Sequence, residues 1–157
     1  MPAVTSNIAK GRVNEFARRI NNNDPANSVF VLALIVSATS KDVLKDYDTL
    51  AQILADGGTD EATHTGYSRI VLDNTDSITV TVNDAGDIQV VDFPDQLFEG
   101  VDDGDDWTHL LLGYDSDSTG GADSAIVPLT LSPFVVSPNG GDISVVVDSD
   151  GAFVAGE

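Results

Sequence analysis

The stretch SITVTVNDAGDIQVVDF, residues 77–93, decides the fold class because apolar and polar residues alternate along its first half. A period of two is typical of a strand with one buried face. The segment NDAGD at 83–87 has the composition of a tight turn, and IQVVDF at 88–93 follows as a second apolar run. The stretch therefore predicts a β-hairpin whose first strand has one face formed by Ile78, Val80 and Val82 and the other by Thr79 and Thr81.

Similar short apolar segments fill the chain from residue 66 onward. Loops rich in Gly, Asp, Ser and Pro separate them, and no helical pattern intervenes. Strands at this regular spacing are typical of an antiparallel sandwich, so we expect a jelly-roll-like β-sandwich over residues 66–157. The other candidate strands are GYSRIVLD (66–73), WTHLLLGY (107–114), SAIVPLTL (124–131), FVV (134–136), ISVVVD (143–148) and AFVA (152–155).

The first part of the chain, residues 1–57, predicts a helix–strand–helix arrangement. Residues 7–24 place apolar side chains at the spacing of one helix face. The run SVFVLALIVSA at 28–38 suits a buried strand, although periodicity alone does not distinguish it from a helix. The expected face of the first helix consists of Val13, Phe16, Ala17 and Ile20.

For residues 40–58 the spacing predicts one continuous helix. Thr39 or Ser40 would cap its N-terminus, and Gly57 would end it. Its buried face would consist of Val43, Tyr47, Leu50, Ala51 and Leu54.

The length and composition predict a single domain, residues 1–157, of the α+β class and mainly β. A domain of 157 residues buries about two-thirds of the surface of its unfolded chain, so its core needs no disulfide or bound metal to be stable. The chain has no cysteine, which excludes disulfides, thiolate metal sites and cysteine nucleophiles. No apolar run approaches the roughly 18 residues of a membrane helix, and no signal-peptide pattern opens the sequence. We therefore expect no membrane partner and no secretory signal.

Charge is the strongest compositional signal. The net charge is −19, from 7 Lys and Arg against 26 Asp and Glu. Six of the seven bases lie in the first 50 residues, and no base follows Arg69. Such a surface repels phosphate backbones, because nucleic-acid affinity comes largely from cations. We therefore expect no nucleic-acid partner.

The predominance of Asp among the acids indicates the environment to which the protein is adapted. Asp supplies 22 of the 26 acids, and lysine is scarce, a composition that resembles the proteomes of extreme halophiles. In molar salt the screening length falls to about 3 Å, which removes most of the self-repulsion. The composition therefore predicts adaptation to high salt. An acidic, calcium-binding surface in ordinary seawater is the alternative.

The loop DSDSTGGADSAI at 115–126 begins like a calcium-binding loop. Asp115, Asp117 and Thr119 stand at positions one, three and five, and Gly120 stands at position six. Position twelve is Ile126, where such a loop needs a bidentate Glu, and the flanking segments read as strands. We therefore favour a turn between strands in which Asp stabilises the backbone.

No group of residues in the sequence has the spacing of a catalytic site. His64 and His109 do not have the spacing of a metal or catalytic motif, and His109 reads as a half-buried strand residue. Trp107 reads as an anchor of the core or of an interface. We assign no catalytic, cofactor-binding or metal-ligating residue and no cofactor, and we expect the protein not to be an enzyme.

Taken in order along the chain, several segments resemble small virion proteins of tailed phages. The shared features are an apolar strand near the start, a GYAR-like tetrad, a Trp-containing segment, an Asp-plus-TGG loop, a PLT step and a GD strand near the end. Here the tetrad is Gly66, Tyr67, Ser68 and Arg69. The segments NDPANS at 23–28 and DYDTLAQILA at 46–55 resemble the head-associated members.

The resemblance implies a structural protein located in the virion, and the acidity implies a tailed virus of a halophilic archaeon. We expect a capsid-surface component of decoration or turret type that forms a homo-oligomer and contacts other virion proteins such as the major capsid protein. Its basic N-terminal part would dock on an acidic shell, although a helix with Arg on its solvent face needs no partner. Arg69 would pair with an aspartate and fix strand register, and a simple exposed strand arginine is the alternative. The alternative is a tail or host-attachment β-sandwich module that binds calcium or glycan.

Overall fold

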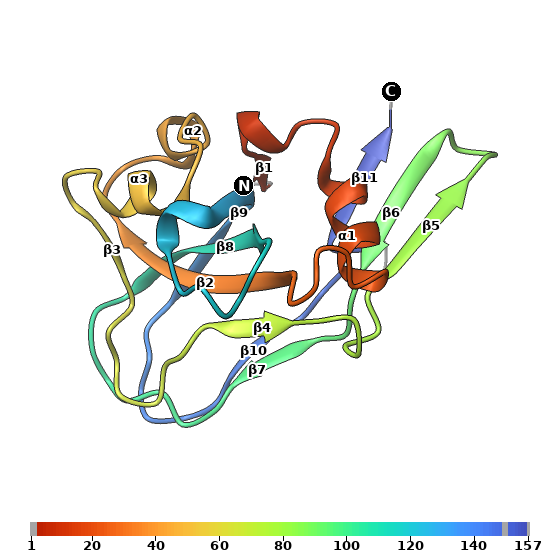
Figure 1. Ribbon diagram of the computed structural model, residues 1–157. Helices are drawn as coiled ribbons and strands as arrows, with labels where there is room; N and C mark the ends of the chain where they lie inside the picture. Colours follow the sequence, from red (N-terminus) through yellow and green to blue (C-terminus); the bar gives the residue numbers. More distant parts are fainter. Residues whose placement is uncertain (1–2, 149–150, 157) are drawn as a thin grey trace.

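A computed structural model describes residues 3–148 and 151–156 and gives a mainly β protein with few helices (Figure 1). Strands account for 36% of the chain and helices for 16%, and every strand pair is antiparallel. The expected α+β class with a predominance of β is therefore confirmed. None of the helices in the described residues is long and apolar enough to cross a membrane.

The largest sheet combines strands from the N-terminal part of the chain with strands from its later part. Its order is β1-β9-β8-β2-β3, and β4 also pairs with β2. Because the N-terminal strand β2 pairs with β8, the predicted N-terminal and C-terminal parts share one sheet. The strands of this sheet are β1 (Val4–Thr5), β2 (Val29–Ser37), β3 (Thr59–Glu61), β4 (Ile70–Leu72), β8 (Trp107–Asp115) and β9 (Ile126–Val136).

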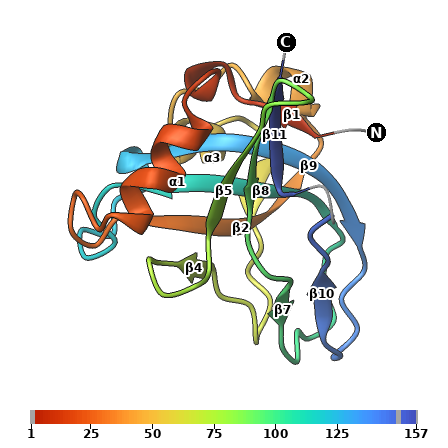
Figure 2. The same cartoon turned by 90° about the vertical axis from the view of Figure 1, so that its right-hand side faces the viewer.

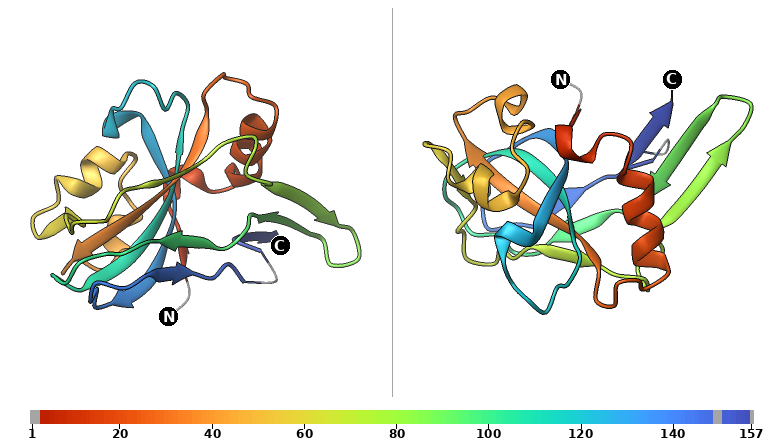
Figure 3. Two further views of the ribbon diagram at one scale, coloured as in Figure 1. Left: turned by 90° about the horizontal axis from the view of Figure 1, so that it is seen from below. Right: turned by 45° about the horizontal axis from the view of Figure 1, so that its top comes forward.

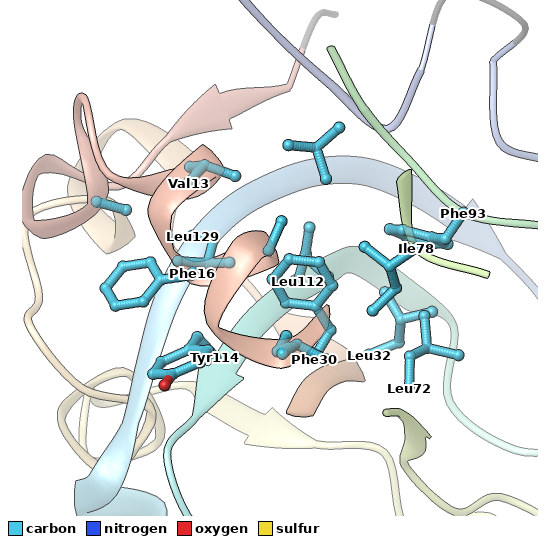
Figure 4. Packing of buried hydrophobic residues seen from close by; sticks show 14 residues of the cluster. Val13, Phe16, Phe30, Leu32, Leu72, Ile78, Phe93, Leu112, Tyr114 and Leu129 are labelled. Carbon is cyan, nitrogen blue, oxygen red and sulfur yellow. The ribbon is translucent and has the colours of Figure 1, made fainter. Parts of the chain in front are cut away.

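Strand β2 confirms the predicted buried strand and is covered on both faces. Phe30 and Leu32 contribute to one hydrophobic cluster, whereas Val31 and Ala33 contribute to another. Since successive side chains of a strand point to opposite faces, a strand covered on both sides has an unbroken apolar sequence. Figure 4 shows the first cluster, where Phe30 and Leu32 lie near the helix that carries Phe16.

The first helix, α1 (Val13–Asn21), covers that first cluster and follows the single turn η1 (Asn7–Ala9). The four predicted face residues are all buried, so the helical interpretation of this segment is confirmed. The ring of Phe16 stacks on Tyr114 of β8 with 4.3 Å between ring centroids. This contact fixes α1 against the sheet and leaves the opposite helix face in solvent.

The predicted single helix over 40–58 is wrong. The structure has two short helices, α2 (Lys41–Leu44) and α3 (Leu50–Leu54), and Val43 is exposed. A second helix start interrupts the segment, because the side chain of Thr49 accepts from the N–H of Gln52. The Gln52 side chain in turn accepts from the N–H of Asp48, which completes an arrangement like a capping box. This local signal overrides the longer apolar period.

The predicted hairpin is confirmed as β5 (Thr79–Asn83) and β6 (Ile88–Asp92), and β11 (Phe153–Gly156) pairs with the other edge of β6. The hairpin extends beyond the rest of the molecule, as Figure 1 and the left view of Figure 3 show. The predicted inner face holds only at its base: Ile78 is buried, Val80 is half-buried and Val82 is 51% exposed. The tip of the hairpin therefore extends beyond the hydrophobic core, so its apolar side chains are exposed there.

A third sheet pairs β7 (Gln96–Phe98) with β10 (Ile143–Val145). The segments SAIVPLTL and FVV, predicted as separate strands, form the single long strand β9, which follows the turn η2 (Asp123–Ala125). The predicted turn SDG at 149–151 lies mostly outside the described residues. The two smaller sheets pack on the face of the large sheet that carries Phe30 and Leu34, and α2 and α3 pack on the other.

Candidate functional site

The exposed positive charges gather on one short segment. Among the described residues, four bases are exposed, and they all lie within residues 10–19, which lead into α1 and form most of it. Figure 2 shows α1 on the outside of the molecule, beside the projecting hairpin. These four residues, which we call the cationic surface, are Lys10, Arg12, Arg18 and Arg19.

One acid lies within the cationic surface. Glu15 accepts from Arg19 at 2.9 Å and from Arg12 at 3.4 Å. These two hydrogen bonds, the one from Arg19 first, lower the pKa of Glu15 below its ordinary value. In the part of the chain that the structure describes, Lys10 and Arg18 form no ion pair. The surface therefore keeps two uncompensated positive charges available to a partner.

The rest of the surface is acidic. Eighteen of the twenty-four acids in the described residues are exposed, and most of them lie in the loops that connect the strands. The two terminal acids outside that range, Asp150 and Glu157, are not described. The charge asymmetry seen along the sequence is therefore also an asymmetry in space, with a small cationic surface on an otherwise anionic molecule.

Arg69 has a structural role. Its guanidinium donates from Nε and Nη2 to Glu61 at 2.8 and 2.5 Å and from Nη1 to Asp123 at 2.7 Å. The pairing with an aspartate is confirmed, and the partner that the sequence did not reveal is Glu61. The hydrogen bonds to Glu61 raise the pKa of Arg69 further above its ordinary value. Glu61 is one of four glutamates in a chain with 22 aspartates. This rarity was the one feature of the sequence that could have singled out Glu61 as the partner of Arg69.

Tyr67 joins the same network. Its hydroxyl donates to Glu61 at 2.8 Å and accepts from the N–H of Leu34 in β2 at 3.0 Å. Burial raises the pKa of the phenol well above its ordinary value, so Tyr67 stays protonated as a donor. Tyr67 and Arg69 of the tetrad thus connect the segment between β3 and β4 to the central strand.

Trp107 is the anchor of an aromatic cluster that shares Tyr67 with this network. Its side chain is 0% exposed, and the rings of Phe98 and Tyr67 lie 5.7 and 5.9 Å from it. Its indole Nε1 donates to Nδ1 of His64 at 3.3 Å, and His64 packs against Gly104. The interpretation of Trp107 as a core anchor is confirmed. His64 is thus an acceptor for the tryptophan, a pairing that no sequence spacing indicated.

The acidic loop after β8 has the geometry of a turn. Asp115 is buried and accepts from the N–H of Asp117, whose own carboxylate accepts from the N–H and hydroxyl of Thr119. The hydrogen bonds from Thr119 lower the pKa of Asp117. Ile126 is buried at the start of β9. Among the described residues, no three His, Cys, Asp or Glu side chains lie close enough together to hold a metal ion.

His109 lies half-buried in β8, as expected. Its Nδ1 shares a hydrogen bond of 2.8 Å with the hydroxyl of Thr108. Burial lowers the pKa of His109, and the positive charge of the buried Lys41 lowers it further. His109 is thus neutral near neutral pH.

Comparison with known proteins gave no match: no family model, no curated protein and no solved structure is similar to the chain. A functional conclusion therefore depends on the charges and contacts described above.

Proposed function

We propose that the protein is a non-enzymatic structural component of a tailed virus particle, located on the head surface and adapted to high salt. The observation that carries this proposal is the separation of charge in space. The exposed bases form the cationic surface at α1, and seventeen of the eighteen exposed acids in the described residues lie elsewhere. The segments that resemble those of small virion proteins, and that follow the same order along the chain, support the same role.

The physical argument concerns how an anionic protein attaches to an anionic shell. A protein of charge −19 is repelled by any acidic neighbour except where its own surface is positive. In molar salt only charges in near contact still attract each other, because the screening length is about 3 Å. A compact cationic surface meets this condition, and it would orient the acidic remainder toward solvent.

We also propose that the three sheets form a jelly-roll-like β-sandwich. Side chains of β6, β7 and β10 pack onto the large sheet through Val91, Phe98 and Val145, which are all buried. Two sheets packed face to face in this way are the layers of a sandwich. Sandwiches of this kind are used in capsid shells.

The experiment measures rebinding of purified protein to virus particles from which it has been stripped. The double variant Lys10→Gln and Arg12→Gln removes the two positive charges at the N-terminal end of the cationic surface, and Arg12 also lies over the Phe16 ring, 4.8 Å from its centroid. We expect its affinity for the particles to fall about tenfold, the scale of one or two close charge pairs.

The matched control is the double variant Gln52→Glu and Asn139→Asp. It makes the same change in net charge, both residues are exposed, and both keep an oxygen for the hydrogen bonds they accept. We expect it to bind like the wild type. Equal weakening by both variants would contradict docking through α1, and absence of the protein from purified particles by mass spectrometry would overturn the virion role.

A further inference from the structure

Strand β5 is an open edge of the projecting sheet. The strand order is β11-β6-β5, so β11 covers one side of the hairpin and nothing in the described residues pairs with the other. Four of the five residues of β5 are exposed. An open edge presents unpaired N–H and C=O groups to any extended chain that approaches.

This edge carries no residue that opposes pairing with another strand. Its sequence, TVTVN, has no charge and no proline, in a chain with 26 acids. Most of the other edges are blunted by features that proteins use against strand addition, although β11, the four-residue opposite edge of the same sheet, also has neither charge nor proline. In the described residues, β3 has two acids, β9 contains Pro128 and Pro133, and β4, β7 and β10 are only three residues long.

The backbone of β5 is oriented for pairing. The carbonyl of Ile78 accepts from the Asn21 side chain of α1 at 3.0 Å, so this carbonyl points away from β6. Residues two apart in an antiparallel strand point their N–H and C=O groups to the same side. The groups of Val80 and Val82 therefore face outward, and the contact with Asn21 sets the lower limit of the free edge.

We propose that β5 is a dimer interface that pairs antiparallel with β5 of a second copy about a two-fold axis at Thr81. The sequence fits this register, since Thr79 lies opposite Asn83, Val80 opposite Val82, and Thr81 opposite itself. Opposed residues share a face. Each exposed Val82 would then be covered by Val80 of the second copy, and the hairpins would form one continuous sheet.

Charge complementarity favours a second copy as the occupant. In this register Asp84, at the hairpin tip, lies opposite Ile78 of the second copy. That residue contacts Asn21 in the last turn of α1, the turn that also carries Arg18 and Arg19. The acidic tip of each copy would thus lie beside the cationic end of the helix in the other. The interface does not depend on the virion role, which is tested at Lys10 and Arg12, residues that this interface does not use.

The first test is sedimentation equilibrium of the purified protein in about 2 M KCl, where repulsion between the copies is screened. A five-residue strand pair is small, so we expect a concentration-dependent dimer that is populated by about 1 mM protein. Val82→Pro removes an outward N–H, and we expect it to be monomeric. Val82→Thr keeps the N–H and should dimerise within about threefold of the wild type.

The second test uses single cysteines in a chain that has none. In the proposed register Thr81 faces its own copy in a non-hydrogen-bonded pair, at a Cα separation of about 4.5 Å that a disulfide spans. We expect Thr81→Cys to form a disulfide-linked dimer on oxidation. Thr79→Cys should not, because the two residues would be offset by four positions, about 13 Å.

These measurements separate the outcomes even where Val82→Pro disturbs the fold. A wild type that remains monomeric at about 1 mM protein would overturn the proposal, as would a dimer in a folded Val82→Pro variant. Faster cross-linking of Thr79→Cys than of Thr81→Cys would overturn the register. Particle binding is measured separately, so loss of the dimer and loss of the virion role are distinguishable.

Discussion

Arg69 holds Glu61 through two parallel hydrogen bonds, from Nε to Oε1 at 2.8 Å and from Nη2 to Oε2 at 2.5 Å. This fork geometry is specific to arginine, because lysine presents a single point charge. Nη1 of Arg69 also reaches Asp123, which lies just before β9. The last base of the chain therefore ties β3 and the segment before β4 to the start of β9.

Arg69→Lys should destabilise the protein by about 2 kcal/mol, because lysine keeps the charge but loses the two-pronged contact to a partly buried carboxylate. The free energy of unfolding in guanidinium chloride would measure this. Arg18→Lys is the control, since Arg18 is exposed and should change stability by less than about 0.5 kcal/mol. Equal effects of the two substitutions would show that the network does not fix the fold.

Gly66, the first residue of the tetrad, is required for a steric reason. Its φ is +86°, and a Cβ atom there would lie 2.3 Å from the carbonyl oxygen of Gly100. Gly66→Ala should therefore cost more than about 2 kcal/mol of unfolding free energy. Gly57→Ala is the matched control, because nothing lies within 4 Å of its Cβ position. A thermal shift assay on both variants checks the difference, and an unchanged Gly66→Ala protein would contradict it.

Trp107→Ala should cost about 3 to 5 kcal/mol, the usual range for deletion of a large buried aromatic side chain. Trp107→Phe fills part of the space but loses the hydrogen bond to His64, so a smaller loss of about 2 kcal/mol is expected. Urea denaturation in high salt gives both values. Wild-type stability of the alanine variant would mean that the side chain is exposed in solution.

Local patterns predicted those elements whose signals lie within a few residues. The face of α1, the buried strand β2 and the β5–β6 hairpin each follow from a short apolar period or a turn. The division of 40–58 into α2 and α3 was missed because Thr49 and Gln52 form a cap that interrupts a plausible helical face. The pairing of β2 with β8 joins residues far apart in sequence, which no local period encodes.

Local patterns also failed to predict the contacts of the charged residues. The charge separation along the chain correctly indicated a basic N-terminal part, but it did not show that Lys41 is buried or that the exposed bases all lie near α1. Arg69 was expected to pair with an acid, and which acid depended on the path of the chain between β3 and β4. Tertiary contacts of this kind can be identified only when the fold is known.

His109 should make stability fall as the pH decreases below about 6.5. Burial and Lys41 lower its pKa in the folded state, so the unfolded chain binds a proton first as pH falls. The stability that His109 contributes is therefore complete above its unfolded pKa of about 6.5 and is lost on acidification. Unfolding free energies at several pH values should fall less steeply for His109→Gln than for the wild type. Parallel curves would contradict this, since the two proteins differ only at residue 109.

Stability should rise steeply with KCl or NaCl and depend little on the divalent ion present. Eighteen acids and no base follow Arg69, and at the screening length of about 10 Å in 0.1 M salt many of them still repel one another. In 1 M salt this length falls to about 3 Å, so most of the repulsion disappears and the melting temperature increases. A bound calcium ion would instead stabilise by mass action and saturate at low concentration.

Asp115→Asn separates these two explanations. Asparagine keeps the oxygen that accepts from the N–H of Asp117, so the turn is preserved while one buried negative charge is removed. We therefore expect the variant to be nearly as stable as the wild type, or slightly more stable at low salt, with an unchanged response to KCl. Melting curves with and without calcium, at fixed ionic strength, provide the measurement. A sharp rise in the wild-type melting temperature at micromolar calcium, abolished by this one substitution, would make the loop at 115–126 a cation site and reject the whole-surface explanation.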